Sequence, residues 1–204
     1  MNTTDSEIKS LLGTTISILE KNQDLGKDIS DIENLPAVFS KTAKYVPSIR
    51  KAFETCKESL ASTPLEENYF ESLNSALKDC KTKIARLHEI FSEVIKHSDP
   101  KAQYRTVAKE DRLEYLMKEI LNHTIKILKN PPFEAVLGEQ VQGLEQALGI
   151  FNAMEPCRVE GKSWHFHNLG NGSMNVNKGS GSQNVNASSG NMFTGSIQNV
   201  HLPK

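Results

Sequence analysis

The sequence contains few of the features that define several common classes of protein. Its 204 residues include three widely spaced cysteines and one tryptophan. An odd, scattered set of cysteines does not provide a disulfide framework and favours a reducing compartment. The net charge of −1 leaves no large basic surface, so we expect no nucleic-acid partner.

Long apolar runs are also missing. No stretch of about 18 consecutive apolar residues occurs, so the chain has no segment suited to cross a membrane as a permanent helix. The first residues lack a basic segment followed by a continuous apolar one, which is the pattern of a secretory signal. Together these absences predict a soluble protein that is cytoplasmic at rest.

Motifs for phosphate and metal binding are incomplete. Gly161-Lys162-Ser163 matches the end of a Walker A loop, but Pro156 stands where the motif needs its first glycine. His165 and His167 would share one face of a strand, with Cys157 upstream, yet no fourth zinc ligand accompanies them. We therefore expect neither a bound metal nor a cofactor.

Catalytic side chains form no recognisable pattern either. Cys56 and Cys80 lie at apolar positions of expected helices, where a free cysteine is usually a small buried hydrophobe. A nucleophilic pair of a cysteine with His88 or His123 stays open, although no local motif supports it. The sequence therefore predicts a protein without enzymatic activity.

What the chain does have is a series of apolar positions at helical spacing, divided by prolines. Three such seams run from Phe39 to Leu60, from Leu113 to Leu128 and from Leu137 to Phe151, and Asn34 is expected to cap the first. The clearest seam follows Pro64 and alternates steps of three and four residues at Phe70, Leu73, Leu77, Cys80, Ile84, Leu87, Phe91 and Val94.

These segments predict an all-α fold. Strand-type alternation is absent from residues 1–155, and long helices joined by short loops pack as antiparallel neighbours. We expect a four- to five-helix antiparallel bundle with its main domain at residues 34–156. An amphipathic helical segment at residues 1–33 precedes it, and a disordered, Gly/Asn/Ser-rich linker and repeat tail at residues 157–204 follows it.

The N-terminal segment carries one apolar stripe, formed by Ile8, Leu11, Leu12, Ile16 and Leu19. One interpretation is a further bundle helix that docks on the core. The other is a membrane-active helix that leaves the bundle after copies of the chain cluster, and one chain can do both in turn. A single copy is expected to bind membranes weakly, because the helix is modest in length and has no basic face.

The last part of the chain repeats every nine residues. Two copies of a Gly-x-Gly turn with a short alternating run begin at Gly170 and Gly179, and a degraded third lies around Gly190. A nearly uncharged, Asn-rich repeat of this kind is prone to stack with copies of itself as cross-β. The residues expected to form this amyloid motif are Gly170, Gly172, Met174, Asn175, Val176, Asn177, Gly179, Gly181, Gln183, Asn184, Val185, Asn186, Gly190 and Met192.

The repeats have two other interpretations. A segment rich in Gly, Ser and Asn often serves as a flexible linker. A calcium-binding β-roll has the same nine-residue period, but its ligand position holds Met174, Gln183 and Met192 instead of aspartate. Thioethers do not bind a hard cation, which excludes calcium. The matched Gly, Asn and Val positions favour self-association over a plain linker.

Several stretches resemble the fungal SesA domain, which occurs at the N-terminus of NACHT and related P-loop receptors and is similar to the HeLo-like cell-death domains. These stretches are Leu35–Pro47, with the sequence LPAVFSKTAKYVP, Cys80–Ile95 and Arg112–Lys118. The repeat at residues 179–186, GSGSQNVN, resembles the prion-like amyloid signalling motifs that follow such domains.

The resemblance implies an effector of fungal non-self recognition and regulated cell death. An NLR-type receptor with a matching motif would template the repeats, and the clustered helices would then act at the plasma membrane. Because the chain ends at Lys204 without a nucleotide-binding domain, the receptor is expected to be a separate protein. The N-terminal stretch is more charged than is usual in the family, and a non-toxic adaptor that recruits other signalling proteins is the alternative.

Overall fold

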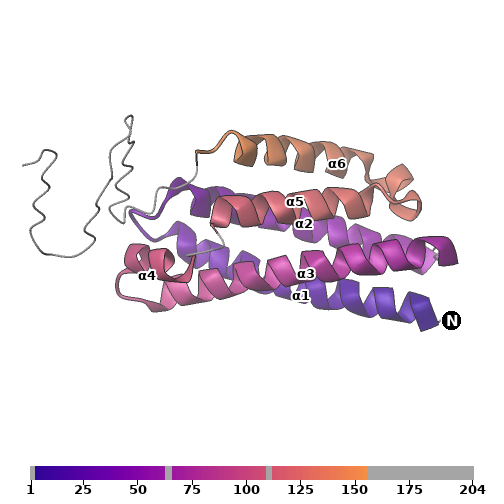
Figure 1. The fold of residues 1–204 in the computed structure, drawn as a ribbon, viewed down its shortest axis with the longest axis horizontal. Helices are drawn as coiled ribbons and strands as arrows, with labels where there is room; N and C mark the ends of the chain where they lie inside the picture. The colour runs from indigo at the N-terminus through magenta and orange to yellow at the C-terminus, as the bar shows by residue number, and fades with distance from the viewer. Residues whose placement is uncertain (1–2, 63–65, 109–111, 156–204) are drawn as a thin grey trace, which may run out of the picture. The chain divides into compact units, whose positions relative to one another are not determined.

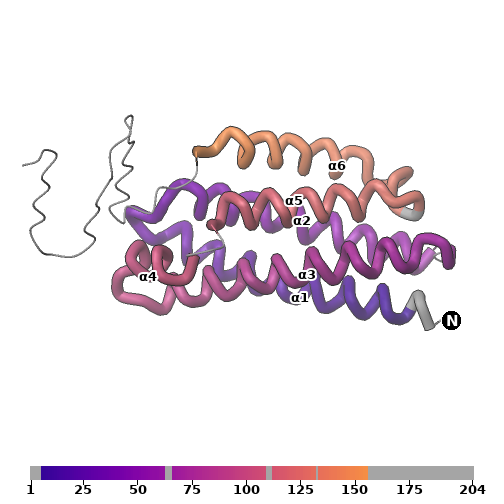
Figure 2. Tube along the Cα trace, viewed as in Figure 1, coloured from indigo at the N-terminus to yellow at the C-terminus, as the bar shows by residue number. Residues whose placement is uncertain are grey.

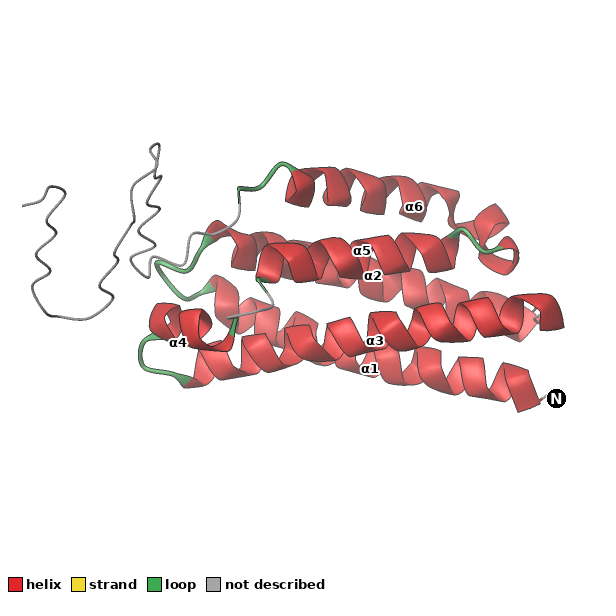
Figure 3. Ribbon diagram, in the orientation of Figure 1, coloured by secondary structure: helices red, strands yellow, loops and turns green. Residues whose placement is uncertain are grey.

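The computed structural model describes residues 3–62, 66–108 and 112–155 (Figure 1). Within these ranges every regular element is a helix, and short loops join them (Figure 3). In chain order the helices are α1 (Thr3–Ser30), α2 (Ala37–Ser62), α3 (Glu67–Lys96), α4 (Pro100–Val107), α5 (Leu113–Leu128) and α6 (Pro131–Asn152). The prediction of an all-α fold is confirmed.

Five of these helices, α1, α2, α3, α5 and α6, are long. Successive long helices run in opposite directions (Figure 1). α1 packs against α2 and α3. α5 also packs against α2 and α3, but within the described residues it does not contact α1. α6 packs against α5 and α2, and the short α4 packs against α3. The chain passes from α5 to α6 through a tight connection, which the Cα trace makes visible (Figure 2).

The helices form where the sequence places apolar residues at steps of three and four. In α3, the predicted seam is fully buried from Leu73 to Val94, whereas Phe70 at its start is half-buried. In α5, ten of the 16 residues are buried. So much buried surface needs neighbours on more than one side, and α2, α3 and α6 provide them.

The short helix α4 is not among the apolar seams predicted from the sequence. The Asp99 carboxylate accepts a hydrogen bond from the Ala102 amide at 3.0 Å, and a proline opens the helix. The Tyr104 ring packs edge-on against Phe39, with centroids 4.8 Å apart. Its hydroxyl accepts a hydrogen bond from the Leu113 amide at 3.1 Å, so α4 fixes the start of α5.

The predicted cap of α2 is wrong. Asn34 has a φ of 66°, in the left-handed region, and lies in the turn between α1 and α2. Asparagine adopts this region more readily than most residues do. α2 begins at Ala37, directly after Pro36, so Asn34 reverses the chain direction instead of capping the helix.

Candidate functional site

The two sets of predicted functional residues have different outcomes. The amyloid-motif residues, from Gly170 to Met192, lie outside the described residues, as do Cys157, His165 and His167 of the incomplete zinc pattern. The apolar stripe of the N-terminal helix lies within α1 and is fully described. The site that can be built from the structure is therefore the seat of α1 on α2 and α3.

The stripe faces the interior of the bundle. Ile8, Leu12 and Leu19 have no exposed surface, and Leu11 and Ile16 are half-buried against the same core. Burying a leucine-sized side chain contributes about 1.5–3 kcal/mol. In this structure α1 is a docked bundle helix, and Ile8, Leu12 and Leu19 are not available to any other surface.

Asn22, which follows the apolar stripe in α1, joins α1 to α3 through its buried amide. Asn22 has no exposed surface, and its Nδ2 donates a hydrogen bond to the Ile84 carbonyl at 3.1 Å. The Nδ1 atom of His88 lies 3.0 Å from the Asn22 Oδ1. Because an amide oxygen only accepts, His88 carries a proton on Nδ1 in this arrangement. Burial, followed by the charge of Lys21, lowers the pKa of His88.

Polar contacts at the surface tie α1 at two further places. Near its start, Glu7 accepts hydrogen bonds from Asn74 at 3.0 Å and from Lys78 at 3.3 Å, both on α3. These two contacts lower the pKa of the Glu7 carboxyl. Further along, Arg50 of α2 donates to Gln23 of α1 at 3.2 Å. Exposed contacts of this kind each contribute little, so the apolar stripe and the buried amide hold most of the helix in place.

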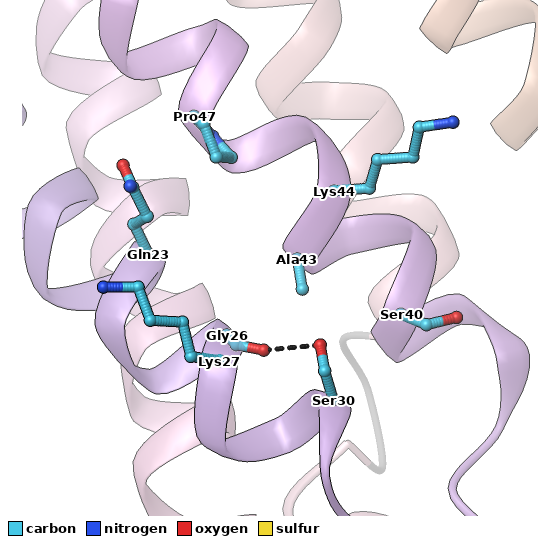
Figure 4. A pocket seen from close by; sticks show the side chains of 8 residues that line it. All are labelled: Gln23, Gly26, Lys27, Ser30, Ser40, Ala43, Lys44 and Pro47. Carbon is cyan, nitrogen blue, oxygen red and sulfur yellow. Dashed lines mark hydrogen bonds between the residues drawn. The ribbon is translucent and has the colours of Figure 1, made fainter.

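α1 and α2 approach each other closely at Gly26. A Cβ atom built on Gly26 would lie 3.2 Å from the Cβ of Ala43, which is closer than ordinary van der Waals contact. An open groove of about 280 Å³ flanks this point, lined by Gln23, Gly26, Lys27, Ser30, Ser40, Ala43, Lys44 and Pro47 (Figure 4).

The polar groups of this groove do not converge on a common point. The Ser30 hydroxyl donates to the Gly26 carbonyl at 2.8 Å, and the Ser40 hydroxyl donates to the Ala37 carbonyl at 3.1 Å. Lys44 points away from the groove (Figure 4). The groove is thus the flank of a close helix crossing, without a set of groups aimed at one ligand.

The cysteine–histidine pair that the sequence leaves open does not form with His88. Its ring faces Asn22, whereas the Cys80 thiol lies 3.9 Å from the Ile120 carbonyl and 3.7 Å from the Thr124 hydroxyl. Burial raises the pKa of Cys80 to about 12 and also raises the pKa of Cys56. Both thiols therefore stay protonated, and a thiol is a much weaker nucleophile than a thiolate.

The described residues hold neither a metal-binding cluster nor a membrane-spanning helix. No three side chains among His, Cys, Asp and Glu gather there in an arrangement that could hold a metal ion. None of the described helices combines the length and the apolar character needed to cross a membrane.

The sequence does not reveal the partners of the polar residues in the α1 seat. Asn22 and Thr15 are both fully buried, although polar residues on an amphipathic helix usually face solvent. The Thr15 hydroxyl is satisfied within α1, since it donates to the Leu11 carbonyl at 2.8 Å. The one available signal is the spacing of Leu12, Leu19 and Asn22, which places the amide on the same face as the apolar stripe.

Comparison with known proteins identifies one family. The family model for SesA, described as an N-terminal domain on NACHT NTPases and P-loop NTPases, matches residues 12–127. This match begins within α1 and ends in the last turn of α5, so it includes most of the α1 seat and stops before α6. No curated protein and no solved structure matches the chain. The chain belongs to the SesA family.

Proposed function

We propose that this chain is an effector of fungal non-self recognition, activated by a separate NACHT-type receptor. The helical domain causes cell death, and the repeats within residues 157–204 receive the signal by amyloid templating. The observation that carries the proposal is the SesA match over residues 12–127, because this family is defined as the N-terminal domain of NACHT NTPases. The repeat composition supports templating, since such segments stack as cross-β.

The seat of α1 explains why a single copy would be inactive. Release of α1 exposes Ile8, Leu12 and Leu19, each of which contributes about 1.5–3 kcal/mol when buried. Binding of one amphipathic helix to a membrane would have to offset that loss. Copies held together along a fibril bind as one multivalent surface, which strengthens a weak association by about 10²–10⁴. Action at the plasma membrane would thus follow clustering and not precede it.

One observation favours a second candidate, a non-toxic helical adaptor. Three residues of the α1 stripe, Ile8, Leu12 and Leu19, are fully used inside the bundle, and the other two, Leu11 and Ile16, are already half-buried against the same core. In the adaptor the bundle stays closed after clustering and recruits other proteins through its outer surface.

The first experiment compares the full chain with a chain lacking residues 165–204 when each is expressed with a receptor that carries a matching repeat. Cell viability and fluorescent foci are measured. The proposal expects foci and loss of viability with the full chain and neither with the shortened chain. Equal killing by both chains would show that the repeats do not receive the signal.

The second experiment separates effector from adaptor. Leu12→Ala loosens the seat of α1, whereas Leu121→Ala empties a buried site on α5, which does not pack against α1 in the described structure. Both should cost about 2–5 kcal/mol of stability. If α1 gives the output, only Leu12→Ala should increase killing at a fixed level of foci. Killing that neither variant changes would favour the adaptor, and an equal increase with both would show that loss of stability in general, and not α1, gives the effect.

A further inference from the structure

α6 differs from the other helices in its glycine content. Gly138, Gly143 and Gly149 all lie within its 22 residues, and all three are exposed. The SesA match ends before α6 begins, so this helix is an addition to the part of the chain that the family model recognises. The helix also precedes directly the segment that carries the repeats.

Nothing in the structure requires glycine at these positions. A Cβ atom built on Gly138, Gly143 or Gly149 would meet no atom within 4 Å, and none of the three has a positive φ. Gly26 of α1 is the contrasting case, because a Cβ there would press on α2. Relative to alanine, each interior glycine lowers the helix equilibrium constant about fivefold, and three together lower it about a hundredfold.

The packing of α6 is also one-sided. Its buried residues are Phe133, Leu137, Leu144, Ala147 and Phe151, and they face only α5 and α2. Outside this stripe, Val136 is 59% exposed and Ile150 is 37% exposed. An exposed ion pair links α6 to the end of α5, with the Lys129 ammonium 2.7 Å from the Glu145 carboxylate.

By contrast, α5 lies inside the bundle. Its ten buried residues face α2 and α3 on one side and α6 on the other. If α6 leaves, the outer side of α5 loses its cover while α1, α2 and α3 keep all their mutual contacts. Opening of α6 can therefore be a local step, because the remaining helices still share one core.

We propose that α6 is the helix that opens first, in a local transition that uncovers the outer face of α5 and leaves the α1 seat closed. The three glycines set the free energy of this opening. The helix that opens first is therefore the one that precedes the repeats in the sequence. This inference goes beyond the proposed function, since it holds whether the bundle kills the cell or recruits a partner.

The test is amide hydrogen exchange on the full chain, measured by mass spectrometry at a concentration where the protein is monomeric. The variant is Gly138→Ala/Gly143→Ala/Gly149→Ala, in which each methyl group projects into open space. The matched control is Gly13→Ala in α1, where the new Cβ would make only an ordinary contact of 3.8 Å with the Lys57 Nζ. Peptides from α3 and α6 report the two regions.

In the wild-type chain, α6 amides should be at least about tenfold less protected than α3 amides. The triple variant should raise α6 protection about a hundredfold, up to the limit set by global unfolding, with little change in α3. Gly13→Ala should leave α6 unchanged. Equal protection of α3 and α6 in the wild type would overturn the proposal, because α6 would then open only with the whole domain. An unchanged α6 in the triple variant would overturn it too.

Discussion

Replacing Asn22 by alanine is a sharp test of how α1 is held. The side chain makes two contacts with α3, one to the Ile84 carbonyl at 3.1 Å and one to the His88 ring at 3.0 Å. A hydrogen bond of this kind contributes about 0.5–1.5 kcal/mol, and a buried group left without a partner costs about 1–3 kcal/mol. Because Asn22 has no exposed surface, its truncation leaves the Ile84 carbonyl and the His88 Nδ1 atom without this partner inside the helix interface. We expect Asn22→Ala to reduce the free energy of unfolding by about 2–4 kcal/mol.

The assay is urea unfolding followed by circular dichroism, since the described domain is entirely helical in its regular structure. Asn122→Ala on the exposed side of α5 is the matched control, and it should change stability by less than about 0.5 kcal/mol. A loss below about 0.5 kcal/mol for Asn22→Ala would refute the reasoning, because it would mean that the buried amide contributes nothing net.

A double variant distinguishes the hydrogen bonds from the shape of the site. In Asn22→Leu/His88→Leu the amide and the imidazole both become apolar, so neither of these side chains is left unsatisfied, and only the Ile84 carbonyl loses a donor. Replacing both members of a buried polar pair is often close to neutral. The double variant should therefore be more stable than Asn22→Ala, and a double-mutant cycle should give a coupling of about 0.5–3 kcal/mol between the two positions.

Three further predictions concern other features of the chain. Burial lowers the pKa of His88 below its unfolded value of about 6.5. The neutral imidazole therefore contributes to stability above that pH, and this contribution is lost as pH falls through the folded pKa. The urea midpoints at pH 7.5 and 5.5 should differ more for the wild type than for His88→Gln. Gly26→Ala should be less stable than Gly13→Ala in the same urea assay, since both gain the helix preference of alanine but only the methyl group at position 26 presses on α2; equal stability of the two variants would contradict the crossing geometry. A peptide of residues 164–204 should form thioflavin-positive fibrils with a reflection at about 4.8 Å, and Val176→Pro/Val185→Pro should prevent them; a wild-type peptide that stays monomeric for weeks would contradict templating.

The long helices could be predicted because their apolar residues repeat at helical spacing. The seam from Leu73 to Val94 is buried without exception at the predicted positions. α4 could not be predicted in this way, because it has eight residues and Tyr104 is the buried residue that anchors it. Its only local signal is the Asp99-Pro100 pair, which also occurs in simple turns.

The role of α1 shows a different limit. Spacing predicts that Ile8, Leu12 and Leu19 share one face, but the same spacing serves a bundle core and a membrane surface equally well. Only the packing against α2 and α3 places the stripe inside the domain. The partners of the Asn22 amide are beyond any local pattern, since they lie on α3, more than 60 positions away in the sequence.

The reactivity of the two buried thiols can show whether the bundle is closed. Cys56 on α2 and Cys80 on α3 are fully buried, and their raised pKa keeps both in the unreactive protonated form. A thiol-specific reagent must therefore wait for the core around them to open before it reacts. The rate of alkylation at these two sites then measures how often the core opens, without any engineered label. Applied before and after fibril assembly, it would distinguish a bundle that stays intact on the fibril from one that comes apart.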